Sequence, residues 1–512
     1  MSAARGSRVR DGIERAVREG SAESPFAGAS LAGASASLPG GEDVIVALAT
    51  PAGRGAVAVI RVSGRGAHEV GERVVRPWPG EARVVRLCEV REPRSGERID
   101  RALVTRFDAP RSYTGEDGLE LATHGGHAVP SAVVAALVAA GAREALPGEF
   151  TRRAVLNWKL DLVQAEAVGD LVDARSPAMR RAALAQLDGG LSRRVAALRD
   201  RVLQVEALIA YDIDFPEEDE GPLPRGRIAE ACGAVLASLD ALLATAPAGE
   251  LVREGAVVVI AGAPNAGKSS LFNALVGEAR AIVTEVPGTT RDAIEAVVDG
   301  GAWPLRLVDT AGLRATDDVV ERLGIEVSER YLARAHVVLA CSEDEPGMAL
   351  VLSRVRAASE APVVGVLTKS DRRRRGGPPP TSESMSRSAA SPHRSSAVVS
   401  EPSPPEPVVS VSAESGEGLG ELTETVGRVL AERYGAPSAE MPLVTRERHR
   451  RGLVEAREEM AMFAEAWSAG ALPAPVAAVH LRAASHALEE LIGGVDVEEV
   501  LGRVFASFCV GK

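Results

Sequence analysis

Short runs of alternating apolar and polar residues fill the first part of the chain. Between Asp43 and about Phe150 the runs "DVIVALAT", "AVAVIRVSG", "ALVTRFDA" and "LELATHGG" predict strands, and "SAVVAALVAAG" predicts a helix. This mixture predicts a compact α+β domain. Residues 1–41 are rich in Ala, Gly, Ser and Arg, and we expect them to form a disordered extension.

A helical pattern begins after "PGEF". Apolar side chains recur three and four residues apart, which predicts one long amphipathic helix that packs on its neighbours. This stripe consists of Leu184, Leu187, Leu191, Val195, Leu198, Val202, Val205 and Ile209. Past "APSAEMP" the chain is helical again, and "HLRAASHALEELIG" places Leu481, Ala484, Leu488 and Ile492 on one face.

Strands and helices alternate between Val257 and Arg433. The strands are "AVVVIAG", "AIEAVVD", "PLRLVDT", "HVVLAC", "PVVGVLTKSD" and "PVVSVSA". Their order predicts a doubly wound α/β domain with a mostly parallel sheet. Because helical patterns flank this unit on both sides, we expect it to be inserted into a helical domain.

These patterns predict the domain boundaries. Within the α/β unit, residues 372–407 are rich in Ser, Pro and Arg and cannot bury enough apolar surface to offset the entropy of ordering them, so they are expected to be disordered. The expected divisions are an extension at 1–41, an N-terminal α+β domain at 42–156, a helical domain at 157–252 and 436–512, and an α/β domain at 253–435.

The composition limits the classes of function. The 512 residues carry a formal net charge of −12, which argues against a nonspecific nucleic-acid coat, so any RNA contact must be local. Four cysteines, at 88, 232, 341 and 509, lie far apart, which predicts neither disulfides nor a zinc site and indicates a reducing compartment. No apolar run approaches the ~20 residues of a membrane span. Because residues 1–41 also contain acidic side chains, a transit peptide is disfavoured and a cytoplasmic location is expected.

A phosphate-binding loop follows the first strand of the α/β unit. "GAPNAGKS", residues 262–269, lies between a strand and an apolar helix, the context this motif requires. The backbone N–H groups and the helix N-terminus cradle the phosphates, Lys268 reaches the β- and γ-phosphates, and Ser269 supplies a hydroxyl to Mg²⁺.

Three further motifs define the nucleotide as GTP. "DTAG" closes a strand, where Asp309 can hold the Mg²⁺ shell and Gly312 can donate its N–H to the γ-phosphate. "TKSD" ends another strand, and Asp371 can accept two hydrogen bonds from guanine that adenine cannot donate; a mismatch costs about 1–3 kcal/mol. "SVSA" is expected to contact the base from the last strand. Thr368 stands where this motif usually has asparagine, and its shorter reach predicts lower affinity for the nucleotide.

A fourth segment, "VTEVPGTTRD", is the other switch motif. Together the motifs predict a GTP site formed by Asn265, Ala266, Gly267, Lys268, Ser269, Ser270, Thr284, Glu285, Val286, Pro287, Gly288, Thr289, Thr290, Asp309, Thr310, Ala311, Gly312, Thr368, Lys369, Ser370, Asp371, Ser412 and Ala413. After "DTAG", Leu313 cannot orient water as a glutamine does in Ras-like enzymes, so hydrolysis needs other groups. The amide oxygen of Asn265 is a candidate ligand for a monovalent cation that would replace an arginine finger.

Motifs from all three expected domains occur in the order found in one family. "TPAGRGAVAVIRVSG", "SYTGEDGLEL", "PGEFTRRAVLNWKLDLVQAEA", "GAPNAGKSS", "VTEVPGTTRD", "DTAGLR" and the ending "FCVGK" together resemble the tRNA modification GTPase family called MnmE or TrmE, over about residues 43–512 without the insertion. The resemblance implies a tetrahydrofolate-binding N-terminal dimerisation domain and an all-α helical domain with an inserted P-loop GTPase domain. It also implies a homodimer whose GTPase domains associate when GTP and K⁺ bind.

The resemblance further implies a reaction and its partners. With an FAD-containing flavoprotein of the MnmG or GidA type, in a heterotetramer or a larger complex, the family adds a carboxymethylaminomethyl group to C5 of the wobble uridine, U34, of certain tRNAs. The folate would be the 5,10-methylene or the 5-formyl form, and no membrane partner is implied. By motif, Arg61, Glu120 and Lys159, with Lys512 from the tail, resemble the folate contacts. A surface salt bridge is the alternative reading of each alone.

The resemblance also assigns the ions and the catalytic groups. Asn265, Thr284, Val286 through its carbonyl, and Thr289 resemble the K⁺ shell, while Ser269 and Thr290 resemble the Mg²⁺ ligands. Glu321, in "DDVVERLGIE", falls on the glutamate that orients the attacking water.

The cysteine near the end of the chain has three possible roles. Prenylation is a poor match, because Val510, Gly511 and Lys512 follow Cys509 where two aliphatic residues are required. The resemblance implies a tail that turns toward the folate pocket, where the Cys509 thiolate is a candidate nucleophile if its pKa is lowered. Packing of the tail is the third alternative.

Two functions remain open from the sequence. One is an RNA-modifying enzyme whose GTPase cycle drives domain movement. The other is a regulatory GTPase of the ribosome-assembly kind, which accounts for residues 257–433 but not for the folate-like motifs or the cysteine tail.

Overall fold

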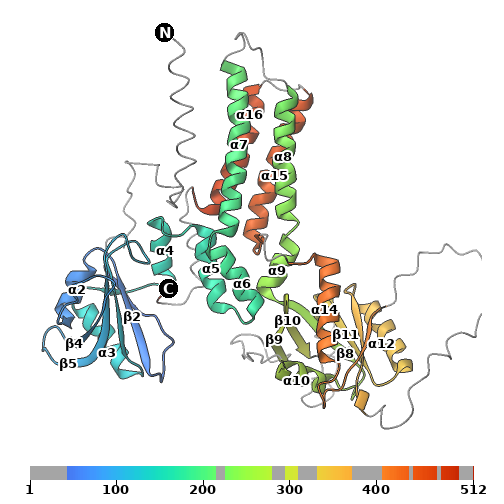
Figure 1. Ribbon diagram of the computed structural model, residues 1–512, viewed down its shortest axis with the longest axis horizontal. Coiled ribbons are helices and arrows are strands. Elements are labelled where there is room, and N and C mark those ends of the chain that lie inside the picture. The colour runs from blue at the N-terminus through green and yellow to red at the C-terminus, as the bar shows by residue number, and fades with distance from the viewer. Residues whose placement is uncertain are drawn as a thin grey trace, which may run out of the picture.

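The computed structural model describes residues 43–214, 225–278, 294–309, 331–371, 406–437, 442–469, 474–494 and Gly511. Within these ranges the chain forms two sheets and a set of long helices (Figure 1). The two sheets lie on opposite sides of the lower end of an upright helical bundle (Figure 1).

The N-terminal sheet has seven strands in the order β3-β4-β5-β6-β2-β1-β7. Helices α2 and α3 pack on it, and the buried core includes Val46, Ile60, Leu121 and Leu137. The strands are β1 (Ile45–Leu48), β2 (Val57–Ser63), β3 (Val75–Arg76), β4 (Val85–Arg91), β5 (Arg98–Phe107), β6 (Gly118–His124) and β7 (Arg143–Glu144), and the helices are α2 (Ala67–Val74), α3 (Ala128–Ala139) and α4 (Glu149–Leu156). The α+β expectation is confirmed for this part of the chain; the patterns missed β3, β4, β7 and α2.

The helices that precede the second sheet in the chain share one apolar core with the helices that follow it. Val195, Val202 and Leu239 from the first set pack with Met460 and Leu488 from the second. The helices are α5 (Leu162–Asp173), α6 (Pro177–Leu187), α7 (Gly190–Asp214), α8 (Arg225–Leu243), α9 (Ala246–Glu254), α15 (Glu447–Ala469) and α16 (Ala474–Ile492). The stripe predicted on α16 is buried.

The predicted single helix from Leu184 to Ile209 is wrong at its beginning. Helix α6 ends at Leu187 and α7 begins at Gly190, because Gly189 adopts a left-handed conformation with φ of 80° that breaks the helix. Leu184 is exposed, and the fully buried stripe starts at Leu191. The apolar residues keep their spacing of three and four across this break, so in the sequence only Gly189 indicates it.

One segment is long and apolar enough to cross a membrane by composition, contrary to the sequence expectation. It covers Gly226–Glu254, within which an 18-residue window has a mean hydropathy of 1.6. It is divided into α8 and α9, and one face of α8, with Ile228, Val235 and Leu239, packs in the bundle core. Because this face of α8 is buried in the bundle core, we interpret the segment as a core helix.

The second sheet has six strands in the order β13-β12-β11-β8-β10-β9. All neighbouring pairs are parallel except β9 and β10, as predicted for a mostly parallel sheet. The strands are β8 (Ala256–Gly262), β9 (Ile294–Gly300), β10 (Trp303–Asp309), β11 (Val337–Ser342), β12 (Val363–Leu367) and β13 (Val408–Ser410), with helices α10 (Lys268–Glu278), α12 (Glu345–Ala358) and α14 (Leu419–Tyr434).

A buried ionic cluster fastens α5 to α15. Glu166 accepts hydrogen bonds from His449 Nε2 at 2.6 Å and from Arg448 Nε and Nη2 at 3.0 and 3.1 Å. Burial alone would raise the pKa of Glu166, but the His449 hydrogen bond and the Arg448 charge lower this pKa to about 2. Burial lowers the pKa of His449, which suits a neutral ring that donates from Nε2.

We expect Glu166→Ala to lower the free energy of unfolding by about 3–5 kcal/mol, because it leaves buried cationic and polar groups without their partner. Thermal denaturation at pH 7 measures this loss. The folded pKa of Glu166 lies below its ordinary 4.5, so the stabilisation is present above pH 4.5 and is lost as the pH falls toward 2, and the gap between wild type and variant should close there. The exposed pair Arg457–Asp240, at 2.8 Å, provides the control: Asp240→Ala should hardly change the midpoint.

Candidate functional site

The phosphate loop connects β8, near the centre of the second sheet, to α10. Gly262, Asn265 and Gly267 have φ of 154°, 66° and 81°, which lets the backbone curl around a ligand. Lys268 begins α10, and its Nζ donates to the Gly262 and Ala263 carbonyls at 3.0 and 2.8 Å, across the loop. The loop and the first turn of α10 therefore form an anion site with a lysine held over it.

Hydroxyl and carboxylate groups for Mg²⁺ flank this loop. Ser269 and Ser270 lie exposed in the first turn of α10. Asp309 ends β10 in register with Ile260 of β8 and is buried. The two strand ends place Asp309 beside the start of the phosphate loop, where its carboxylate suits an Mg²⁺ shell.

The base-reading motif lies at the ends of β12 and β13. Ser412 Oγ donates to Asp371 Oδ1 at 2.9 Å, and the Ser370 N–H donates to the Val411 carbonyl at 3.1 Å. Lys369, with φ of 56°, donates through Nζ to the Asn265 carbonyl at 3.2 Å and pairs with Glu343. These contacts orient the Asp371 carboxylate and join the base side of the site to the phosphate loop.

Thr368 takes part in that connection. Its hydroxyl contacts the Ala266 carbonyl at 2.9 Å and the Ser342 carbonyl at 3.2 Å, and the side chain is buried. Although the threonine side chain is shorter than that of asparagine, its hydroxyl therefore still reaches the phosphate loop. Its effect on the affinity for guanine stays a prediction.

Thr368→Val removes this hydroxyl and keeps the shape. We expect GTP to bind about 3- to 10-fold more weakly, since a neutral hydrogen bond contributes about 0.5–1.5 kcal/mol. Titration with a fluorescent GTP analogue measures the Kd. Thr368→Ser, which keeps the hydroxyl, is the matched control and should retain affinity; a Val variant that binds like wild type would contradict this role.

Several predicted site residues lie outside the described residues. These are Thr284, Glu285, Val286, Pro287, Gly288, Thr289, Thr290, Thr310, Ala311, Gly312, Glu321, Cys509 and Lys512. Of the chain's end, Gly511 is described: a Cβ built on it would lie 2.5 Å from the Leu48 carbonyl, so this residue packs closely against the end of β1.

A second candidate site lies in the N-terminal domain. Arg61 of β2 and Glu120 of β6 are cross-strand partners, with Arg61 Nε and Nη2 at 3.0 and 2.9 Å from Glu120 Oε1. The Arg61 guanidinium lies 5.2 Å from the ring centre of Tyr113 and 5.8 Å from that of Phe150. These side chains line a cavity of about 90 Å³. Whole-ligand pockets are usually about 300 Å³ or larger, so this cavity can hold one ring of a larger ligand.

Lys159 lies beside this cavity rather than in it. Its Nζ donates to the Pro110 carbonyl at 3.0 Å, in the loop that continues to Tyr113. The structure thus brings Arg61 and Glu120 together and places the Lys159 ammonium against the loop that lines the cavity. Tyr113 and Phe150 were not predicted, although both lie within the quoted motifs; their contacts with Arg61 join segments that are distant in the sequence.

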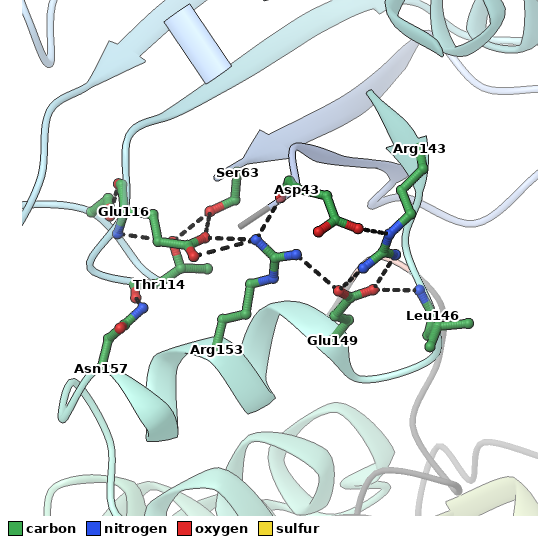
Figure 2. Close-up of polar contacts among 10 residues, drawn as sticks. Asp43, Ser63, Thr114, Glu116, Arg143, Leu146, Glu149, Arg153 and Asn157 are labelled. Atoms are coloured by element: carbon green, nitrogen blue, oxygen red, sulfur yellow. Dashed lines mark hydrogen bonds and ion pairs between the residues drawn. The ribbon is translucent and has the colours of Figure 1, made fainter. Parts of the chain in front are cut away.

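An ionic network positions the helix that borders the cavity (Figure 2). Arg153 of α4 donates to Glu116 at 3.2 Å, to Glu149 at 3.0 Å and to the Asp43 carbonyl at 2.9 Å. Arg143 donates to Glu149 at 2.6 Å. Burial would raise the pKa of Glu149, but its hydrogen bonds from Arg143 and Arg153 lower this pKa to about 2, so the network is ionised at neutral pH. It fixes α4 on the sheet.

The phosphate loop, Asp309 and the "TKSD" and "SVSA" motifs lie along one edge of one sheet, at the carboxyl ends of parallel strands. That arrangement defines the class of P-loop GTPases.

Comparisons with known proteins extend this class to a family. The family model described as the MnmE helical domain matches residues 162–509, and the one described as GTP-binding protein TrmE N-terminus matches residues 44–159. A tRNA modification GTPase MnmE of Heliobacterium modesticaldum is 39% identical over 488 residues, covering 92% of this chain and 99% of that protein. One of Thermus thermophilus is 42% identical over 479 residues, covering 92% and 99%. The chain belongs to the tRNA modification GTPase MnmE family.

The chain is therefore a GTPase that acts in tRNA modification. Among solved structures, the G domain of the T. maritima FeoB iron transporter is similar at 24% identity, covering 34% of this chain and 98% of that chain with a TM-score of 0.23, and the assignment does not depend on it.

Proposed function

We propose that the chain, with an FAD-containing partner of the MnmG type, adds a carboxymethylaminomethyl group to C5 of the wobble uridine of certain tRNAs. Hydrolysis of GTP in the α/β domain would drive the movement that this reaction needs. The proposal includes a homodimer, a cytoplasmic location and domains at 42–156, 157–252 with 436–512, and 253–435. What carries it is the pairing of Arg61 with Glu120 beside two aromatic rings, in a chain that also holds a phosphate loop and an Asp371 carboxylate oriented by Ser412.

The N-terminal cavity fits one part of a reduced folate. The Glu120 carboxylate can accept hydrogen bonds from an amino-pyrimidine ring, and the Tyr113 and Phe150 rings can stack on it. Arg61, Lys159 and Lys512 are cationic and suit the carboxylates of the glutamate tail. When bound, the folate would supply a one-carbon unit, and Cys509 is the proposed nucleophile near it.

The GTP site fits two ions. Ser269 and Thr290 would hold Mg²⁺ between the phosphates, with Asp309 in its outer shell. Asn265, Thr284, Val286 and Thr289 would hold K⁺, and Glu321 would orient the attacking water. Association of two GTPase domains would complete this site. The K⁺ ion and Glu321 would then do the work of the glutamine that Ras-like enzymes have and this chain lacks.

Nucleoside analysis of tRNA tests the proposed reaction. Cells that lack the gene should contain wobble uridine without the carboxymethylaminomethyl group by mass spectrometry, and the wild-type gene should restore it. Arg61→Ala and Cys509→Ser should fail to restore the group while the purified variants hydrolyse GTP at the wild-type rate. Unaltered tRNA in the deletion strain would contradict the proposal and favour a regulatory switch.

A further inference from the structure

A second hollow lies at the carboxyl end of α4, between the N-terminal domain and the helical bundle. Its volume is about 330 Å³, which is in the range of small-ligand sites. Val155 and Trp158 line it from the end of α4, Arg193 and Arg199 from α7, and Glu489 from α16. No function described above uses these side chains.

Trp158 has two features that are unfavourable for a surface residue. It follows the last turn of α4 in a left-handed conformation with φ of 58°, a position that normally carries glycine because a bulky side chain is strained there. Its side chain is also 69% exposed, so packing does not offset the strain. Of the four tryptophans, Trp303 and Trp467 are buried, at 1% and 8%. A strained and exposed aromatic beside a hollow points to a ligand.

The end of α4 is held firmly in this place. Asn157 Nδ2 donates to the Thr114 carbonyl at 2.7 Å, and the Arg153 network fixes the helix one turn earlier (Figure 2). Trp158 N–H donates to the Val155 carbonyl at 3.0 Å. The indole is therefore presented from a rigid support, as a stacking platform requires.

Helix α7 contributes two arginines to the wall of the hollow. Arg199 lies 3.7 Å from Glu489 through Nη2, but its buried Nε has no hydrogen-bond partner among the described residues. Arg193 is exposed and donates through Nη1 to the Asp188 carbonyl, next to the start of α7. An unpaired buried N–H of a charged group is costly, and an anionic ligand would satisfy it.

The local charge differs in sign from that of the whole chain. Three cationic side chains and two carboxylates line the hollow, whereas the chain carries −12 overall. One of the carboxylates, Asp161, caps α5 by accepting from the Gln164 N–H at 2.8 Å. An exposed aromatic side chain and arginines that line one hollow suit a nucleotide, because the base can stack on the ring and the phosphate can bind the cations.

We propose that this hollow binds one unstacked nucleotide of the tRNA substrate, with its base on Trp158 and its phosphate at Arg193 and Arg199. Phe150, in the wall of the Arg61 cavity, and Val155, in the wall of the hollow, are five residues apart on α4, which is roughly 8 Å at ~1.5 Å per residue. A nucleotide held here would present its neighbours to that cavity. The inference rests on tRNA as the substrate, not on the proposed folate chemistry.

Binding of RNA by the full chain tests the site. The probe is a fluorescein-labelled anticodon stem-loop RNA with uridine at the wobble position. It is titrated at several NaCl concentrations without folate, K⁺ or partner protein, and each variant is compared with the wild type at the same salt. Trp158→Ala should weaken binding about tenfold, since stacking on an aromatic contributes about 1–3 kcal/mol per base, and Trp158→Phe should stay within about threefold of wild type. Arg193→Ala should lower the slope of log Kd against log salt by about one.

Two variants separate binding from folding. Trp158→Gly should weaken RNA binding as much as Trp158→Ala without lowering the thermal midpoint, because glycine relieves the backbone strain. Arg482→Glu, 75% exposed on α16 and paired with Glu206, is the charge control and should bind like wild type. RNA should also quench the tryptophan fluorescence of the wild type but not of Trp158→Phe.

Two results would overturn the inference. One is RNA binding by Trp158→Ala and Arg193→Ala within twofold of wild type. The other is a Trp158→Ala variant with weakened self-association in sedimentation and unchanged RNA binding, which would make the hollow a contact between two copies of the chain. Neither result bears on wobble-uridine chemistry, and loss of that chemistry with intact Trp158-dependent binding would leave this inference standing.

Discussion

Replacing K⁺ by Na⁺ is expected to slow GTP hydrolysis by about 10³-fold or more. An arginine finger that stabilises the charge of the transition state contributes about 10³–10⁵ in rate, and this chain has Leu313 where a Ras-like enzyme has its glutamine. A cation held between the phosphates would supply the same stabilisation. Phosphate release under single-turnover conditions, in KCl and in NaCl at equal ionic strength, measures the effect.

Asn265 provides the variant that connects this effect to the chain. Its φ of 66° suits asparagine and glycine but strains alanine, so Asn265→Gly removes the amide oxygen and keeps the loop conformation. Its carbonyl can still accept from Lys369. We expect Asn265→Gly to bind GTP normally and to lose most of the K⁺ stimulation, while Asn265→Asp, which keeps an oxygen, retains part of it.

The oligomeric state is the independent control. If K⁺ acts by joining two GTPase domains, sedimentation with KCl and a transition-state mimic should show that association, and NaCl should not support it. Equal hydrolysis rates in the two salts, or separate GTPase domains with mimic and KCl present, would contradict the potassium proposal while leaving the nucleotide site in place.

The GTP-binding edge could be predicted because each of its parts is local in sequence. A glycine-rich loop after an apolar strand, or an aspartate that ends one, needs no knowledge of the rest of the fold, since parallel strands bring their carboxyl ends to one edge. Asp309 and Asp371 lie where this rule places them.

Contacts between distant segments could not be predicted in this way. The hydroxyl of Thr368 reaches the Ala266 carbonyl because β12 and β8 lie on either side of β11 in the sheet, a fact of tertiary structure. Trp158 was not predicted as a binding residue, because its case depends on the arginines of α7 that line the same hollow and on its left-handed conformation after α4. The break at Gly189 was hidden because apolar spacing of three and four continues across it.

Glu321→Ala is expected to lower the rate of GTP hydrolysis by about 10²–10⁴-fold, the range of general acid–base catalysis. In the proposed mechanism this carboxylate orients the attacking water, since Leu313 cannot. GTP affinity should be unchanged, because Lys268 and Asp371 make their contacts without it. Stopped-flow binding of a fluorescent GTP analogue and single-turnover hydrolysis separate the two quantities. Glu421→Ala, an exposed carboxylate in the first turn of α14, is the matched control and should hydrolyse GTP at the wild-type rate.

The same variant decides whether hydrolysis is needed for modification. If the GTPase cycle drives the movement, Glu321→Ala should bind GTP, fail to turn it over, and leave the wobble uridine of the complemented deletion strain without its carboxymethylaminomethyl group. Fully modified tRNA with hydrolysis reduced 10²-fold or more would show that binding of GTP alone is sufficient. In that case the nucleotide acts as an allosteric ligand that selects a conformation, and its hydrolysis only resets the protein.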